Sequence, residues 1–265
     1  MMRLEHPVAN SFPARIHVLF ASNASTAVVI RRGPAKAVCT IEWDRRKDVF
    51  RLGQWLKGRI YERRSDLSPD GKFMIYFAMN GRWHSEAKGA WTAVSRAPYL
   101  KAVALYPKGD CWNGGGLFTS RNSYWLNSGY GHEVAHESSE VRRDDRFTPV
   151  GGIGNECLGV YFPRLLRDGW KLVGPTAFEK PFVQGWSLRK LAHASAPRDP
   201  GKGVYWDEHE LVHHQQGIAI PFPNWEWAEV DGSRLVWAEK GILNAGIVNA
   251  KGLSDPKVLI DLNPM

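Results

Sequence analysis

Apolar and polar residues alternate over short stretches along most of the chain, and turn-forming residues separate these stretches. Alternation with a period of two is typical of β-strands that bury one face. The clearest case is the segment 59–78, in which Pro69, Asp70 and Gly71 separate two stretches of strand composition. Proline presets φ at the first corner of a turn, and glycine accepts a positive φ. The segment therefore predicts a β-hairpin.

Comparable strand pairs recur along the chain. Their turns centre near residues 23, 70, 122, 168 and 231. Most of these intervals are close to the roughly 45 residues of one four-stranded propeller blade. Radial repetition of such blades buries both faces of each small sheet and leaves few open edges. We therefore predict an all-β fold in which residues 1–265 form a single five-bladed β-propeller domain with four-stranded blades.

Individual blades lead to more detailed expectations. Four strands are expected before Gly58, and strands over 160–166 and 170–173 are expected to flank a turn at residues 168 and 169. The last interval is the longest and needs an insertion. A loop at 197–203, between an extra strand pair at 186–192 and 204–212, can supply it. Whether the region from residue 174 to residue 224 forms a regular blade stays open.

Composition favours many short strands joined by tight turns. Aromatic residues make up 12% of the chain, which has 12 Trp, 26 Gly and 16 Pro, and glycine and proline are the residues that destabilise helices most. We expect the tryptophans to pack between blades, with stacking on sugars or nucleobases as the alternative. Trp225 and Trp227 are expected to face the same way, because Glu226 separates them.

The hairpin sequence Ser68-Pro69-Asp70-Gly71, followed by an aromatic strand, resembles the inner hairpin of TolB-like and WD-type propeller repeats. Degenerate copies lie at Asp168-Gly169 and Asp231-Gly232. This resemblance implies a fold and no particular chemistry. Stretches in the middle of the chain, among them residues 61–69 and 91–96, are also similar to a family of uncharacterised bacterial proteins. That likeness implies a bacterial cytosolic protein and no activity.

Charge and cysteine content limit the classes of partner and compartment. The chain has 35 Lys and Arg against 27 Asp and Glu, a formal net charge of +8, which suits nucleic acid, an anionic membrane or an acidic protein. The basic residues are dispersed in small groups, which favours a solvated surface. Cys39, Cys111 and Cys157 form neither a disulfide framework nor a zinc knuckle. With no apolar segment of signal-peptide or membrane-spanning length, we predict a cytoplasmic protein.

The sharpest catalytic motif is His132-Glu133-x-x-His136. On a helix, both imidazoles could bind Zn²⁺ and Glu133 could act as a general base on the metal-bound water. Glu156 lies where zinc metalloproteases of the gluzincin type, which this pattern resembles, place a third ligand. The surrounding residues lack an apolar helical face, and residues 157–163 have strand composition. We therefore favour a polar loop or blade edge and keep a zinc-dependent hydrolase as an alternative.

Other polar clusters support no defined catalytic set. Asp66, Glu156 and Glu229 lie at or near expected inner strands and could form the carboxylate group of a propeller glycosidase, but turn or channel-lining roles are favoured. Histidines and acids at 207–214 could bind a metal, but a solvated strand edge is the simpler interpretation. The triple glycine 114–116 lacks the rest of a phosphate-binding motif.

The sequence therefore predicts a non-enzymatic β-propeller binding module that recognises a protein partner, with a scaffold or immunity-type role and a preference for an acidic partner. A propeller glycoside hydrolase is the first alternative, and the zinc hydrolase is the second. We predict no cofactor, no resident metal and no membrane partner. Nucleic acid is the less favoured partner, and a monomer is the expected oligomeric state.

Overall fold

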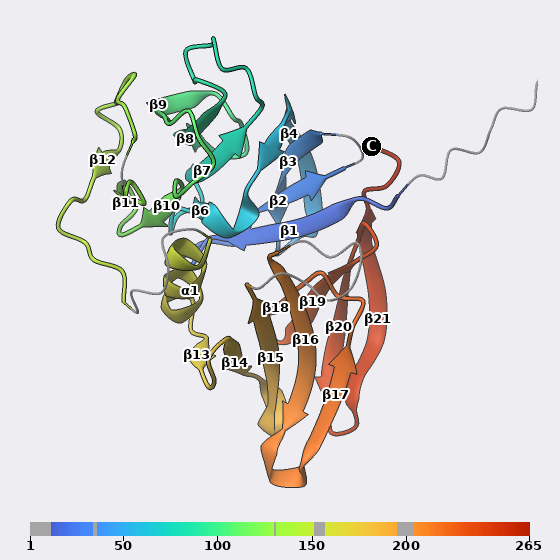
Figure 1. Ribbon diagram of the computed structural model, residues 1–265. Coiled ribbons are helices and arrows are strands. Elements are labelled where there is room, and N and C mark those ends of the chain that lie inside the picture. Colours follow the sequence, from blue (N-terminus) through green and yellow to red (C-terminus); the bar gives the residue numbers. More distant parts are fainter. Residues whose placement is uncertain (1–11, 34–35, 130, 151–156, 195–203) are drawn as a thin grey trace, which may run out of the picture.

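Short antiparallel strands make up most of the structure, a computed structural model that describes residues 12–33, 36–129, 131–150, 157–194 and 204–265 (Figure 1). Within these residues the strands form five sheets in chain order, and one α-helix lies between the third and the fourth sheet. The predicted all-β class is confirmed at this level. No helix in the described part of the chain is long and apolar enough to cross a membrane.

The first and the fifth sheet are four-stranded antiparallel meanders. The first contains β1 (Arg15–Phe20), β2 (Thr26–Arg32), β3 (Ala37–Asp44) and β4 (Val49–Lys57). The fifth contains β18 (Trp227–Asp231), β19 (Arg234–Glu239), β20 (Ile242–Asn249) and β21 (Gly252–Asp261). The expectation of four strands before Gly58 is therefore confirmed.

The second sheet contains the predicted 59–78 hairpin with one interruption. Its strands are β5 (Arg59–Ile60), β6 (Asp66–Leu67), β7 (Phe73–Met79), β8 (Ala90–Arg96) and β9 (Ala102–Pro107). β5 and β6 both pair with β7, and a 3₁₀ turn, η1 (Glu62–Arg64), separates them. Arg63 and Arg64 belong to this turn, and both are buried.

The third sheet is small, whereas the fourth is larger than a regular blade. The third contains β10 (Gly116–Phe118), β11 (Ser123–Leu126) and β12 (Arg142–Arg143). The fourth contains β13 (Lys171–Leu172), β14 (Ala177–Pro181), β15 (Trp186–His193), β16 (Trp206–His213) and β17 (Ile218–Phe222), with 3₁₀ turns η2 (Val183–Gly185) and η3 (His214–Gln216). The predicted extra strand pair is confirmed as β15 and β16. The predicted insertion loop at 197–203 lies outside the described residues.

The expected strand over 160–166 is wrong, because this segment belongs to the helix α1 (Leu158–Arg167). Its Val-Tyr-Phe run has high β propensity, but apolar residues also recur at helical spacing. The residues of this apolar face are Leu158, Tyr161, Phe162 and Leu165. They pack against Trp170 and Phe178 of the fourth sheet region, so tertiary burial decides the local structure in favour of the helix.

The turn expected at residue 168 is the end of that helix. Gly169 has a φ of +89°, which favours glycine. The amide of Gly169 donates to the carbonyl of Leu166, and the amide of Trp170 donates to the carbonyl of Leu165. These two bonds are the Schellman arrangement that satisfies the last helical carbonyls. An Asp-Gly pair that resembles a hairpin turn therefore caps a helix here.

Apolar clusters join the sheets in chain order. The first sheet shares one apolar cluster with the second sheet and another with the fifth sheet. The second sheet also shares a cluster with the third sheet. The fifth sheet shares a cluster with the fourth sheet and α1. Between the third and fourth sheets, α1 contacts β10 and η1. Figure 1 shows β1 crossing the middle of the molecule, with sheets on both sides of it.

Trp225 and Trp227 pack in different directions, contrary to the expectation. Trp227 belongs to the cluster between the first and fifth sheets and lies edge-on to Phe20. Trp225 stacks between Phe222 and Trp237, in the cluster shared with the fourth sheet. Trp225 precedes β18 and lies in a turn, so the alternation of a strand does not apply to it.

Candidate functional site

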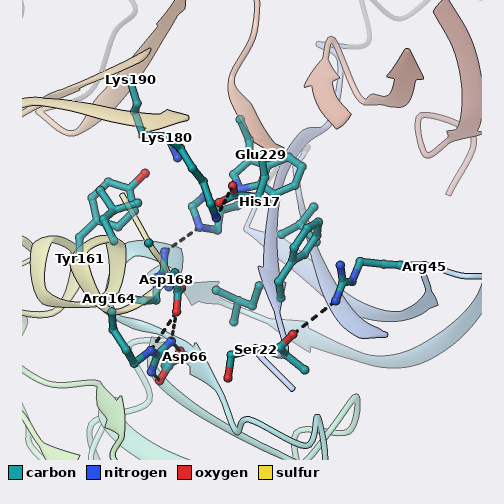
Figure 2. Close-up of a pocket in the computed structure, with 18 residues that line it drawn as sticks. His17, Ser22, Arg45, Asp66, Tyr161, Arg164, Asp168, Lys180, Lys190 and Glu229 are labelled. Atoms are coloured by element: carbon teal, nitrogen blue, oxygen red, sulfur yellow. Dashed lines mark hydrogen bonds and ion pairs between the residues drawn. The ribbon is translucent and has the colours of Figure 1, made fainter. Parts of the chain in front are cut away.

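A cavity of about 410 Å³ opens beside α1, where β1, β6, β14, β15 and β18 come together (Figure 2). Part of its wall is apolar and includes Val18, Phe20, Leu165 and Trp227. The charged residues that line it are Arg45, Asp66, Arg164, Arg167, Asp168, Lys180, Lys190 and Glu229. In Figure 2, Lys180 and Lys190 approach from one side and Arg45 from the other. Residues from four sheets and the helix therefore meet in one space.

Asp66 is fixed by the helix and the third sheet. Arg167 binds both of its carboxylate oxygens, with Nη1 to Oδ2 at 2.5 Å and Nη2 to Oδ1 at 2.8 Å. The backbone amide of Phe118 donates to the same Oδ2 at 2.7 Å. The Asp66 side chain is only 2% exposed. This paired fork geometry orients both groups and connects β6, β10 and α1.

Asp168, at the end of α1, shares the same guanidinium. Arg167 donates to Asp168 Oδ1 at 2.9 Å. Burial raises the pKa of Asp168 and the nearby Asp66 carboxylate adds to this, while Arg167 opposes it. Asp168 is buried and shares the Arg167 cation with Asp66, and it therefore takes up a proton more readily than an ordinary aspartate.

Glu229 connects the fifth sheet to the fourth. Lys180 Nζ donates to Glu229 Oε1 at 2.9 Å, and the indole of Trp170 donates to Oε2 at 3.0 Å. The amide of Val230 also donates to Oε1. Both oxygens of Glu229 are therefore occupied by fixed donors, and Lys180 has a carboxylate partner.

Lys190 is the most buried cation of the cavity. It lies on β15, the middle strand of the fourth sheet, and only 1% of the residue is exposed. Its Nζ lies 4.5 Å from the Trp170 ring centroid and 5.7 Å from that of Tyr161. Burial lowers the pKa of Lys190, while Asp207 and Glu229 oppose this and Arg164 adds to it. The hydrogen bonds of the described residues include none from its ammonium.

His17, on β1, is held as a neutral imidazole. Arg164 Nη2 donates to His17 Nε2 at 3.0 Å, and a guanidinium can only donate. The proton of the neutral ring must therefore be on Nδ1. Burial lowers the pKa of His17 well below its usual value, and the Arg164 charge adds to this. Arg164 also donates to the carbonyls of Glu62 and Ser65, which fixes its position.

A second cavity, of about 500 Å³, shares the His17 wall on the other side. A buried ion pair lies at this boundary, with Arg63 Nη2 2.6 Å from Asp207 Oδ1. Tyr161 donates its hydroxyl to Asp207 Oδ2 at 2.7 Å. The Arg63 charge lowers the pKa of Asp207 against the effect of burial. In the second cavity, burial raises the pKa of Glu226 to about 7.

The structure brings together two of the three carboxylates proposed from the sequence. Asp66 and Glu229 line the same cavity, and Glu156 lies outside the described residues. Sequence reasoning missed Asp168 as a site residue, because its Asp-Gly pair resembled a turn. It also missed Lys190, which is one of 35 basic residues and occupies an ordinary strand. Only the spatial arrangement distinguishes Lys190 from the others.

The His132-Glu133-x-x-His136 motif lies in a loop beside β9. The side chains of His132 and Glu133 contact residues outside the motif. His132 Nε2 is 3.1 Å from Thr92 Oγ1, and Glu133 is 2.5 Å from Lys88 Nζ. The backbone of His136 forms an isolated bridge with β9. The two imidazoles thus have no common helical face. Among the residues that the structure describes, no three His, Cys, Asp or Glu side chains are grouped to hold a metal ion.

The interpretation of 207–214 as a solvated strand edge is wrong. β16 is an inner strand, paired with β15 on one side and β17 on the other. Its Asp207, His209 and His213 are all buried. Polar composition misled here, because Arg63 binds Asp207 and His209 Nδ1 donates to the carbonyl of Trp225 inside the protein.

Comparisons with known proteins give no family for the chain. Neither a protein-family model nor a curated protein matches it. One similar solved structure is the uncharacterized protein lmo1340 of Listeria monocytogenes EGD-e, with 10% identity, a TM-score of 0.33, and coverage of 93% of this chain and 66% of that chain. Another is Kuenenia stuttgartiensis hydrazine synthase, with 9% identity, a TM-score of 0.30, and coverage of 93% and 80%. At these TM-scores neither likeness carries an argument.

Proposed function

We propose that the protein is a cytoplasmic binding module built as a five-bladed β-propeller, and that it recognises a protein partner whose acidic groups enter the cavity beside α1. The order of the sheets supports the propeller, because apolar clusters join neighbouring sheets as they join blades, with α1 between the third and the fourth sheet. β1, β6 and β18, from three different sheets, contribute to the cavity as inner strands contribute to an axial channel.

The charge of the cavity carries this proposal. Five basic side chains and three carboxylates line the cavity. Attraction between charges is stronger in a partly enclosed site than at an open surface, because the effective dielectric constant is lower. The ion pairs among the lining residues also hold the donors in place, so binding requires little reordering of side chains. An acidic group is the complement of such a site.

A labelled hexaglutamate peptide tests the proposal by fluorescence anisotropy at low salt. We expect saturable binding that weakens steeply in 0.5 M salt, as ionic attraction is screened. Lys180→Met should weaken it by about threefold to tenfold, since one lining cation is lost and Glu229 loses its partner. Arg51→Met is the matched control, because Arg51 is 72% exposed and does not line the cavity. Equal weakening by both substitutions, or equal binding of hexalysine, contradicts the proposal.

A glycoside hydrolase is the second candidate function, favoured by the three carboxylates of the cavity. Asp66 is ion-paired, whereas the raised pKa of Asp168 suits a general acid. This candidate ranks second because each of the three carboxylates already has a bond to a fixed cation.

A panel of nitrophenyl glycosides tests the hydrolase. If the protein cleaves one of them, Asp168→Asn should lower kcat by about a hundredfold, because the residue can no longer donate a proton. Asp145→Asn serves as the control, since this exposed carboxylate lies away from the cavity lining. Turnover that survives Asp168→Asn, or absence of turnover across the panel, removes this candidate.

A further inference from the structure

The ammonium of Lys190 has no hydrogen-bonded partner among the described residues, whereas Arg167 and Lys180 of the same cavity are paired with carboxylates. Arg167 binds Asp66 and Asp168, and Lys180 binds Glu229. Within the described part of the chain, the Lys190 Nζ lies beside the faces of two aromatic rings, and Asp207 and Glu229 act on its charge without a hydrogen bond to it. A buried ammonium loses its hydration and is strongly destabilised unless an anion or acceptor replaces the water. Its position on the cavity wall therefore points to a ligand.

His17 adds a neutral donor on the same wall. Its Nε2 accepts from Arg164, so Nδ1 carries the ring proton. No described residue accepts a hydrogen bond from this Nδ1. The ring centroid of Tyr161 lies 6.2 Å from that of His17 and 5.7 Å from Lys190 Nζ, so the imidazole and the ammonium both lie close to one ring. Figure 2 shows His17, Tyr161 and Lys190 around the same space.

The available donors set the class of ligand. Arg164 uses its donors on His17 and on the carbonyls of Glu62 and Ser65. The Lys190 ammonium and the His17 Nδ1–H therefore remain as donors for the ligand. Two donor groups match the two oxygens of a carboxylate better than the larger oxygen set of a phosphate. Val18, Phe20 and Trp227 on the cavity wall offer an apolar surface to the rest of the molecule.

We propose that Lys190 and His17 bind the carboxylate of a small organic acid, with its apolar body against β1 and Trp227. This inference deepens the proposed function, because it names the acidic group that the cavity receives and the donors that hold it. It requires the site to bind a free acid without any partner protein.

Isothermal titration with benzoate and phenylacetate tests the inference, with neutral benzamide and inorganic phosphate as comparison probes. We expect both acids to bind with a Kd below about 10 mM, and benzamide to bind at least about tenfold more weakly. Binding should also shift the Nδ1–H proton resonance of His17. Phosphate that binds as tightly as benzoate, or absence of saturable binding by either acid, overturns the assignment.

Lys190→Met supplies the matching variant. It should abolish benzoate binding, while Lys171→Met, on the exposed strand β13, should leave it unchanged. The melting temperature of Lys190→Met should be no lower than that of the unaltered protein, because a buried ammonium without a hydrogen-bonded acceptor is removed. Benzoate binding that persists in Lys190→Met contradicts the inference. If benzoate fails to bind while hexaglutamate still does, the proposed function stands without this site; failure of both overturns both.

Discussion

Arg63 and Lys190 show how differently two buried cations can be accommodated in this protein. Arg63 forms an ion pair with Asp207 and donates to the carbonyl of His193 at 2.8 Å. Its planar fork satisfies two acceptors at once. Lys190 lies against aromatic rings and leaves its ammonium at the cavity. The ion pair of Arg63 stabilises the interior of the protein. The burial of the Lys190 ammonium destabilises the folded state, and a ligand that binds Lys190 would restore that stability.

The buried histidines predict a loss of stability in acid. Burial lowers the pKa of His209 to about 3, well below the value near 6.5 of an unfolded chain. The unfolded state therefore binds a proton that the folded state does not, so the free energy of unfolding falls as pH falls from 6.5 towards 3. One such histidine contributes up to about 1.4 kcal/mol per pH unit. His17 acts in the same direction.

Urea unfolding between pH 7 and pH 4 measures this effect. His209→Asn should flatten the pH dependence, because the titrating group is gone while an amide can still donate to the carbonyl of Trp225. His136→Asn, at an exposed position, should leave the slope unchanged. A slope equal to that of the unaltered protein in His209→Asn would show that carboxylates account for the acid sensitivity.

Among the elements, the sequence predicted strands better than it predicted the helix. The alternation around Gly71 identified the hairpin, because Phe73, Ile75 and Phe77 all lie on β7. It failed for α1, whose apolar residues satisfy a strand and a helix equally well over ten residues. The choice depends on Trp170 and Phe178, which lie outside the helix segment and pack against it in the folded protein. Local sequence does not contain that information.

The candidate site was harder to predict than its supporting strands. Asp66 and Glu229 were recognised as inner-strand carboxylates, and they do line one cavity. Their partners Arg167 and Lys180 come from the helix end and from β14, far away in sequence. Pairing between such distant residues sets the pKa of each carboxylate, and therefore whether it can donate a proton or stays bound in an ion pair. No spacing rule specifies these pairs.

At the scale of the whole molecule, contacts between the first and fifth sheets bring the two ends of the described chain together. Arg31, buried on β2, donates to the carbonyl of Leu262 at 3.1 Å and to that of Met265 at 2.6 Å. The amide of Ala14 donates to Asn263 Oδ1 at 2.9 Å. Two long-range ion pairs, Arg45 with Asp231 and Arg234 with Asp48, connect the same sheets. These bonds make the stability of the first sheet depend on residues after β21.

Leu262→Ala tests this dependence. The side chain is fully buried in the cluster that joins the first and fifth sheets, so its removal leaves a cavity there. We expect the free energy of unfolding to fall by about 2 to 4 kcal/mol in urea denaturation. Leu52→Ala, at a position on β4 that is 52% exposed, should change it by less than about 0.5 kcal/mol. If the two substitutions had equal effects, the first sheet would be stable without the fifth, and contact between the chain ends would not stabilise the fold.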